Sequence, residues 1–85
     1  MAKLISELEV GDKVFIIHKD DWIFDVAEII EDCLSFFKIV FYFKGTHAYL
    51  WKCDDPIRKT FNYIVFIDES KALNVFKSKL NGRNR

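Results

Sequence analysis

The chain has 85 residues, the size of one small domain, and a chain this short buries only about 60–65% of the surface that its unfolded form exposes. Apolar residues make up 51% of it, with one Pro and three Gly, which is enough hydrophobic surface to exclude a disordered chain. The 13 basic and 13 acidic residues give a formal net charge of zero, without the basic excess that dedicated nucleic-acid binders usually show.

The balanced charge is unevenly distributed along the chain. Residues 1–35 hold three Lys and nine acidic residues, whereas residues 36–85 hold ten Lys and Arg and four acidic residues. Such a split can form a basic patch for an anionic partner, or it can cancel between neighbouring strands. The sequence leaves both outcomes open.

The first residues carry charges and no apolar signal core, and the longest apolar runs, 14–17 and 39–43, are too short to span a bilayer. We therefore expect a cytoplasmic protein with no membrane partner. Cys33 and Cys53 are expected to be free thiols, because small secreted scaffolds usually carry more cysteines.

The first predicted element is a strand at 13–18, which the turn signal Val10-Gly11-Asp12 opens and the loop at Asp20-Asp21 closes. Residues 22–34 fit two patterns. Apolar residues at helical spacing with acidic residues opposite indicate a helix, and Asp21 can cap it. The β-forming residues Trp22, Phe24, Val26 and Ile30 fit a bent strand equally well.

Two pairing strands are predicted next. The run 36–44 is β-branched and aromatic, with Gly45-Thr46 as its turn, and 47–53 pairs with it. Alternation divides the side chains between two faces. One face holds Phe37, Ile39, Phe41, Phe43, Ala48 and Leu50, and the other holds Phe36, Lys38, Val40, Tyr42, Lys44, His47, Tyr49, Trp51 and Cys53.

Residues 54–60, with the one proline, are predicted to form a loop, and 61–67 a last strand. A helix at about 69–80 follows, capped by Asp68 or Ser70 and ended by Asn81-Gly82. Its apolar stripe is Ala72, Leu73, Phe76 and Leu80. We expect one domain at 1–82 and a frayed tail at 83–85.

The order of these signals resembles small barrels of the SH3-like, KOW and Tudor type. The residues that carry the resemblance are Val10-Gly11-Asp12-Lys13-Val14, Val26-Ala27-Glu28-Ile29-Ile30 and Phe37-Lys38-Ile39-Val40-Phe41. The close Val65-Phe66-Ile67-Asp68-Glu69-Ser70-Lys71-Ala72-Leu73 resembles that of small phage and mobile-element accessory proteins. The chain departs from the Tudor pattern by lacking an Asp-Gly turn after the third strand.

The resemblance implies a mainly β (α+β) fold, an SH3-like barrel of four to five antiparallel strands with a C-terminal helix. It favours a strand over a helix at 22–31. It also implies a fold that binds peptides, methylated side chains or nucleic acid and is rarely catalytic, although function must be argued from the site.

The sequence shows no signature of a nucleophile, an acid–base pair or a phosphate-binding loop, so we expect no enzymatic activity. The paired carboxylates Asp20-Asp21 and Asp54-Asp55 are interpreted as solvated turn residues. The set Cys33, Cys53, His18 and His47 lacks the paired spacing of zinc sites, and no metal or cofactor is expected.

The 14 aromatic residues exceed what a core of this size needs, and interfaces are enriched in Tyr, Trp, Phe and Arg. The leading hypothesis is a small phage or mobile-element accessory protein that binds and modulates a host protein through an aromatic sheet face. The predicted partner-binding residues are Trp22, Lys38, Tyr42, Lys44, His47, Tyr49, Trp51 and Arg58.

Four alternatives stay open. The aromatic residues can instead form the core, or they can close a homo-oligomer. Lysines beside Tyr42, Tyr49 and Trp51 are also typical of a surface that stacks bases and follows phosphates. Finally, the acidic residues Asp20, Asp21, Asp25, Glu28, Glu31 and Asp32 could imitate a nucleic-acid backbone, which requires a helix at 22–34 to align them.

Overall fold

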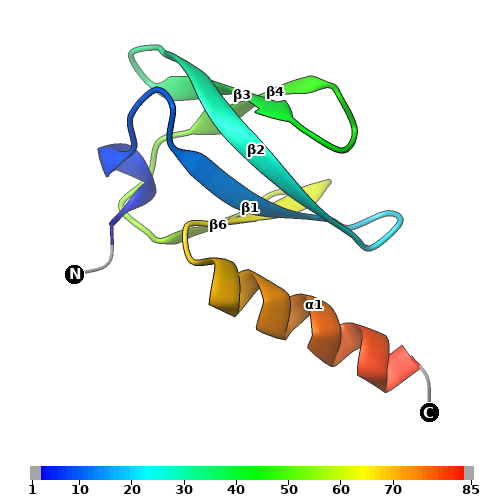
Figure 1. The fold of residues 1–85 in the computed structure, drawn as a ribbon. Helices are drawn as coiled ribbons and strands as arrows, with labels where there is room; N and C mark the ends of the chain where they lie inside the picture. The colour runs from blue at the N-terminus through cyan, green and yellow to red at the C-terminus, as the bar shows by residue number, and fades with distance from the viewer. Residues whose placement is uncertain (1–2, 84–85) are drawn as a thin grey trace.

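Strands form where β-branched and aromatic residues alternate between turns. A computed structural model describes the backbone of residues 3–83 and the side chains of residues 3–80. The elements are the 3₁₀ helix η1 (Ile5–Glu7), the strands β1 (Lys13–His18), β2 (Ile23–Asp32), β3 (Phe36–Phe41), β4 (His47–Trp51), β5 (Ile57–Lys59) and β6 (Tyr63–Phe66), and the helix α1 (Glu69–Arg83) (Figure 1).

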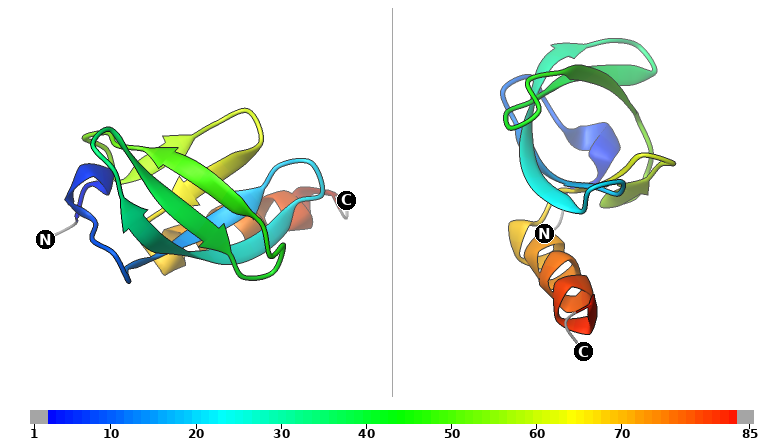
Figure 2. Two further views of the ribbon diagram at one scale, coloured as in Figure 1. Left: turned by 90° about the horizontal axis from the view of Figure 1, so that it is seen from above. Right: turned by 90° about the vertical axis from the view of Figure 1, so that its right-hand side faces the viewer.

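The six strands make one antiparallel sheet in the order β4-β3-β2-β1-β6-β5. The sheet curls into a half-barrel, and the view along its axis shows α1 outside the ring of strands (Figure 2, right). A bulge between Ile29 and Glu31 shifts the register of β2 against β3, a feature that bends a strand and increases its twist. The predicted mainly β barrel-like fold with a C-terminal helix is confirmed.

The barrel interior is the larger of two hydrophobic clusters. Side chains from every second position of β1, β2 and β3 point into it, and the predicted face that holds Phe37, Ile39 and Phe41 is the inner face of β3. The buried members are Ile5, Leu8, Val14, Ile16, Ala27, Ile29, Phe37, Ile39, Phe41, Leu50 and Val65.

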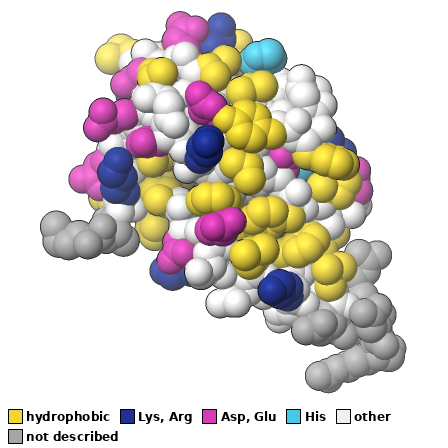
Figure 3. Space-filling view, viewed as in Figure 1, with side chains coloured by type: hydrophobic (Ala, Val, Ile, Leu, Met, Phe, Trp, Pro, Cys, Tyr) yellow, Lys and Arg dark blue, Asp and Glu magenta, His cyan; other side chains and the backbone are white. Residues whose placement is uncertain are grey.

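A second cluster lies on the outer face of β1 and β6, beneath α1. Its buried members are Ile17, Trp22, Ile64, Phe66 and Ala72. Because β1 is buried on both faces, it reads as a continuous apolar run rather than an alternating one. Figure 3 shows hydrophobic side chains in a band that crosses this side of the sheet and reaches the helix.

Residues 23–32 form a strand, as the resemblance favoured. The burial of β2 alternates through Asp25, Ala27 and Ile29, and the strand pairs with β1 on one side and β3 on the other. Pairing with β1 and β3 satisfies the backbone N–H and C=O groups of β2 on both sides. The local sequence pattern does not contain this information, because both partners come from other parts of the chain.

Several predicted boundaries were wrong. The third predicted strand ends at Phe41 rather than Lys44, because residues 42–44 form the turn into β4. Residues 57–59 form the edge strand β5 inside the predicted loop, so the sheet has six strands rather than four to five. The last strand covers only 63–66, and α1 extends past Leu80 to Arg83. The rest of the predicted tail, 84–85, lies outside the described residues.

The N-terminal segment, in which no element was predicted, closes one end of the barrel. Ile5 of η1 is fully buried in the interior cluster. The amides of Ile5 and Ser6 donate to the carbonyls of Asp55 and Cys53, which ties η1 to the connection between β4 and β5.

Candidate functional site

An aromatic surface covers the outer face of β3 and β4. We define it by five side chains, Phe36, Lys38, His47, Tyr49 and Trp51. The register pairs Phe36 with Trp51 and Lys38 with Tyr49. The ring of Phe36 lies 4.9 Å from that of Tyr49 and 5.1 Å from that of Trp51, measured between centroids.

Two of these three rings are half exposed. Tyr49 keeps 55% and Trp51 52% of its surface accessible, and Phe36 is partly covered by both. Aromatic side chains that contact one another in the open make a rigid apolar surface, of the kind that protein interfaces use as anchors. The structure thus supplies an exposed aromatic cluster on a small barrel-like fold.

The lysines around this surface are paired with acidic residues from the first part of the chain. Lys38 Nζ lies 3.4 Å from Glu31 Oε1, and Lys52 Nζ lies 2.7 Å from Asp32 Oδ1. The uneven charge along the sequence therefore cancels between neighbouring strands here. Because each ammonium already faces a carboxylate, a phosphate would have to compete with that carboxylate.

A third such pair lies at the turn into β4. Lys44 Nζ lies 2.8 Å from Asp21 Oδ2, and this hydrogen bond lowers the pKa of Asp21. The predicted site residue Lys44 is therefore held at the β1–β2 turn, away from Tyr49 and Trp51. Tyr42, 51% exposed, donates its hydroxyl to Glu28 of β2, and this hydrogen bond raises the pKa of the phenol.

Two other predicted site residues lie elsewhere in the fold. Trp22 is 8% exposed and stacks on Phe76 of α1, and its Nε1 donates to the carbonyl of Phe76 at 3.1 Å. Arg58 belongs to β5, where its Nε is buried without a hydrogen-bond partner among the described residues. The structure therefore brings together Lys38, His47, Tyr49 and Trp51 of the eight predicted residues.

Phe36 is the residue that the sequence reasoning left out of the site. Alternation placed it on the same face as Lys38, but only the pairing of Phe36 with Trp51 shows that its ring joins Tyr49 to Trp51. The signal was its place directly before Phe37, whose inward direction requires Phe36 to point outward.

A buried polar pair occupies one end of the barrel interior. His18 Nε2 lies 3.0 Å from Asp25 Oδ2, and the two residues are 9% and 3% exposed. The Asp25 carboxylate also accepts the backbone N–H groups of Val26 at 2.7 Å, Phe43 at 2.8 Å and Lys44 at 3.2 Å. It thereby fixes the turn between β3 and β4.

Two opposing effects act on the pKa of Asp25. Burial raises it, but the hydrogen bonds from Phe43, His18, Lys44 and Val26 together outweigh burial and hold the pKa below its ordinary value. The ring of Phe41 meets His18 edge-on, with centroids 4.8 Å apart, and seals the pair. The Asp25 carboxylate therefore holds the β3–β4 turn, and His18 holds the carboxylate in place.

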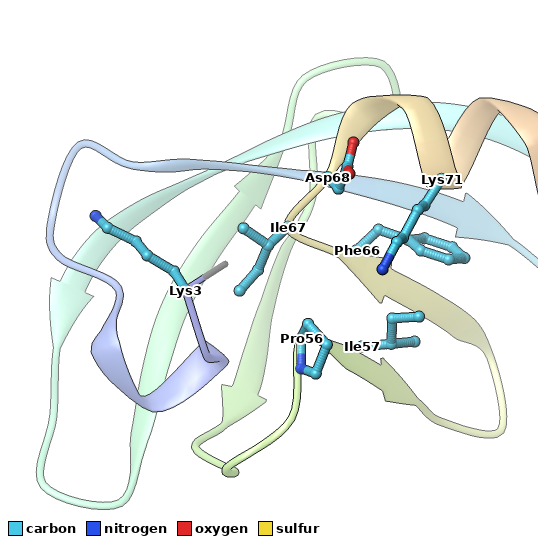
Figure 4. A pocket seen from close by; sticks show the side chains of 7 residues that line it. All are labelled: Lys3, Pro56, Ile57, Phe66, Ile67, Asp68 and Lys71. Carbon is cyan, nitrogen blue, oxygen red and sulfur yellow. The ribbon is translucent and has the colours of Figure 1, made fainter. Parts of the chain in front are cut away.

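A hollow of about 270 Å³ lies between the start of α1, β5 and β6 (Figure 4). Its walls include Pro56, Ile57, Phe66 and Ile67, and Lys71 reaches over it.

The Asp68 carboxylate accepts the Ser70 N–H at 2.9 Å, which confirms Asp68 as a cap of the helix.

The described residues contain no cluster of three His, Cys, Asp or Glu placed to hold a metal ion. Cys33 and Cys53 are free thiols, and burial, followed by the neighbouring Glu31, raises the pKa of Cys33. No described helix has the length and apolar character needed to cross a bilayer.

The chain was compared with family models, with curated proteins and with solved structures, and none of the three comparisons found a match. The class that the fold and surface define is a small antiparallel half-barrel with a C-terminal helix and an exposed aromatic cluster.

Proposed function

We propose that this protein is a non-catalytic binding module that docks on another protein through the aromatic surface. The observation that carries the proposal is the half-exposed contact of Tyr49 and Trp51 around Phe36. The interior and outer clusters are filled by other side chains, so these rings are not needed for the core. Central aromatic anchors of this kind contribute much of the affinity at protein interfaces.

The finer proposal is an SH3-like accessory protein of a phage or mobile element, which acts in the cytoplasm and changes the activity of a host protein. It is supported by the resemblance of the strand openings and of the strand-to-helix close, and by the small size of the domain. No step of chemistry is assigned to the protein itself.

Nucleic-acid binding is the second candidate, since Lys38 and Lys52 flank rings on which bases could stack. The salt bridges of both lysines weigh against it. Imitation of a nucleic-acid backbone has less support, because residues 23–32 form a strand and Asp25 is buried inside the barrel.

The test uses the double variant Tyr49→Ala/Trp51→Ala and the control Phe61→Ala, which removes a 91% exposed ring elsewhere on the surface. The tagged full-length proteins are used to capture partners from extracts of a plausible host. We expect one stoichiometric protein with the unchanged protein and with the control. Loss of a single anchor, at about 2 kcal/mol or more, weakens binding by about 30-fold or more, so the double variant should lose at least that much affinity.

Two results would contradict the proposal. One is the absence of any stoichiometric protein partner for the unchanged protein. The other is salt-sensitive binding of short single-stranded DNA or RNA at physiological salt, with loss of that binding in the double variant, which would establish the second candidate instead.

A further inference from the structure

One edge of the strand β4 has no backbone partner among residues 3–83. The strand is first in the sheet order, and within the described part of the chain β3 is the strand that pairs with it. A strand edge of this kind presents a row of backbone N–H and C=O groups to which another strand can bind.

The hydrogen bonds around the β3–β4 hairpin determine which residues face outward. Phe41 N–H donates to Thr46 O, and Lys52 N–H donates to Ser35 O. Because bonded and non-bonded pairs alternate along an antiparallel ladder, Ala48 and Leu50 bond to β3 between these two points. The backbone groups of the remaining three residues, His47, Tyr49 and Trp51, therefore point to the free edge.

The other edge of the sheet is protected, and β4 is not. The strand β5 has three residues, follows Pro56 and contains Lys59, which are devices that discourage pairing with another chain. The strand β4 has five residues, His-Ala-Tyr-Leu-Trp, without a proline, lysine or acidic residue. This contrast indicates that the edge of β4 is kept available.

We propose that the free edge of β4 pairs with the same edge of a second copy of this chain, antiparallel and centred on Tyr49. This register aligns all three outward-facing residues, since Tyr49 meets Tyr49 of the other copy and His47 meets Trp51. It offers about six backbone hydrogen bonds. It is the only centred register that uses all three.

The chemistry of β4 fits a copy of itself. A two-fold interface places like residues against one another, so a charged residue near the axis would meet its own charge. The strand β4 has no charged side chain, and just beyond its ends Thr46 meets Lys52 rather than Lys52 meeting itself. The chain as a whole has zero formal net charge, so two copies do not repel each other.

The pairing extends the aromatic surface. His47, Tyr49 and Trp51 lie on the outer face in both copies, so the two surfaces become one across the four strands β3, β4 and their counterparts. The Tyr49 carbonyl accepts the Tyr63 hydroxyl at 3.1 Å, so at the centre of the proposed pair the incoming N–H has to use the second lone pair of that oxygen. This inference does not depend on the aromatic surface binding a partner protein.

The first experiment measures solution mass and amide hydrogen exchange of the full chain from micromolar to millimolar concentration. We expect the mass to rise from 10.1 kDa to twice that value. The amides of His47, Tyr49 and Trp51 should become protected together with it, whereas Ala48 and Leu50 are protected at every concentration. A chain that stays monomeric overturns the proposal, and so does a dimer in which the three outward amides exchange freely.

The second experiment removes one N–H group and keeps every side chain. Cys33 and Cys53 allow chemical assembly of the chain from segments 1–32, 33–52 and 53–85, with N-methyl-Tyr49 in the middle segment. We expect a folded monomer, whereas N-methylation of Leu34, which is 95% exposed and outside the strands, should leave the dimer intact. Unchanged dimerisation of the Tyr49 derivative would overturn the proposal, as would amides at 47, 49 and 51 that become protected only when a partner protein is added.

Discussion

The carboxylate of Asp25 should be one of the main determinants of stability. It is 3% exposed and accepts hydrogen bonds from His18 and from three backbone N–H groups. Asp25→Ala removes the acceptor and leaves these donors unsatisfied. An unsatisfied buried donor lowers the free energy of unfolding by about 1–3 kcal/mol. We expect the free energy of unfolding to fall by about 3 kcal/mol in total, with faster exchange of the Phe43 and Lys44 amides.

The pH dependence gives a second readout with a defined sign. The pKa of Asp25 is lower in the folded protein than its ordinary value of 3.8, so its contribution to stability is complete above that pH. As the pH falls below 3.8 toward the folded pKa, the unfolded chain takes up the proton first and the contribution is lost. The stability difference between the unchanged protein and Asp25→Asn should therefore shrink only in that acidic range.

The assay is urea unfolding followed by tryptophan fluorescence at pH 7 and at several values below 4. Asp20→Ala is the control, because Asp20 is exposed in the same β1–β2 turn, and we expect it to change stability by no more than about 0.5 kcal/mol. Equal stability of Asp25→Ala and Asp20→Ala would refute the reasoning. A difference between the unchanged protein and Asp25→Asn that does not vary with pH would refute the linkage argument.

Three further substitutions test other parts of the fold by urea unfolding. Ile5→Ala should lower the free energy of unfolding by about 3 kcal/mol, because Ile5 is fully buried. The control Val10→Ala, at a 58% exposed site, should lower it by less than about 0.5 kcal/mol. Equal effects of the two substitutions would mean that η1 does not close the barrel. Trp22→Phe should cost about 1 kcal/mol through loss of the hydrogen bond to the Phe76 carbonyl, and an unchanged unfolding midpoint would contradict that bond. Gly45→Ala should lower the free energy of unfolding by about 1 kcal/mol, because the φ of Gly45 is +69° and no atom lies within 4 Å of the added Cβ, so the loss comes from the backbone conformation alone. Asn adopts this conformation more readily than Ala, so Gly45→Asn should recover part of the loss.

Local pattern was sufficient for much of the sheet. Alternation predicted that Phe37, Ile39 and Phe41 share one face of their strand, and the structure buries all three. The same alternation predicted that Tyr49 and Trp51 share a face, and the structure, which leaves both half exposed, decides that this face is surface rather than core. These features follow from the two-residue period of a strand, which is a property of the sequence itself.

Other features depend on residues far apart in the chain. The stretch 22–34 satisfies helical and strand spacing alike, and only pairing with β1 and β3 determines that it is a strand. Trp22 was predicted as a partner-binding residue. The docking of α1 on the outer face of β1 and β6 covers it, and that docking is a contact across 54 positions.

The sequence by itself determined the mainly β composition, the C-terminal helix and the two faces of β3 and β4, because each depends on the spacing of neighbouring side chains. Tertiary structure alone decided how the charges pair, as in Lys52 with Asp32, and how η1 and α1 cover the two sides of the sheet. It also decided which strand edges stay open, since the backbone partners of a strand are set by the order of strands in the sheet and not by its own residues.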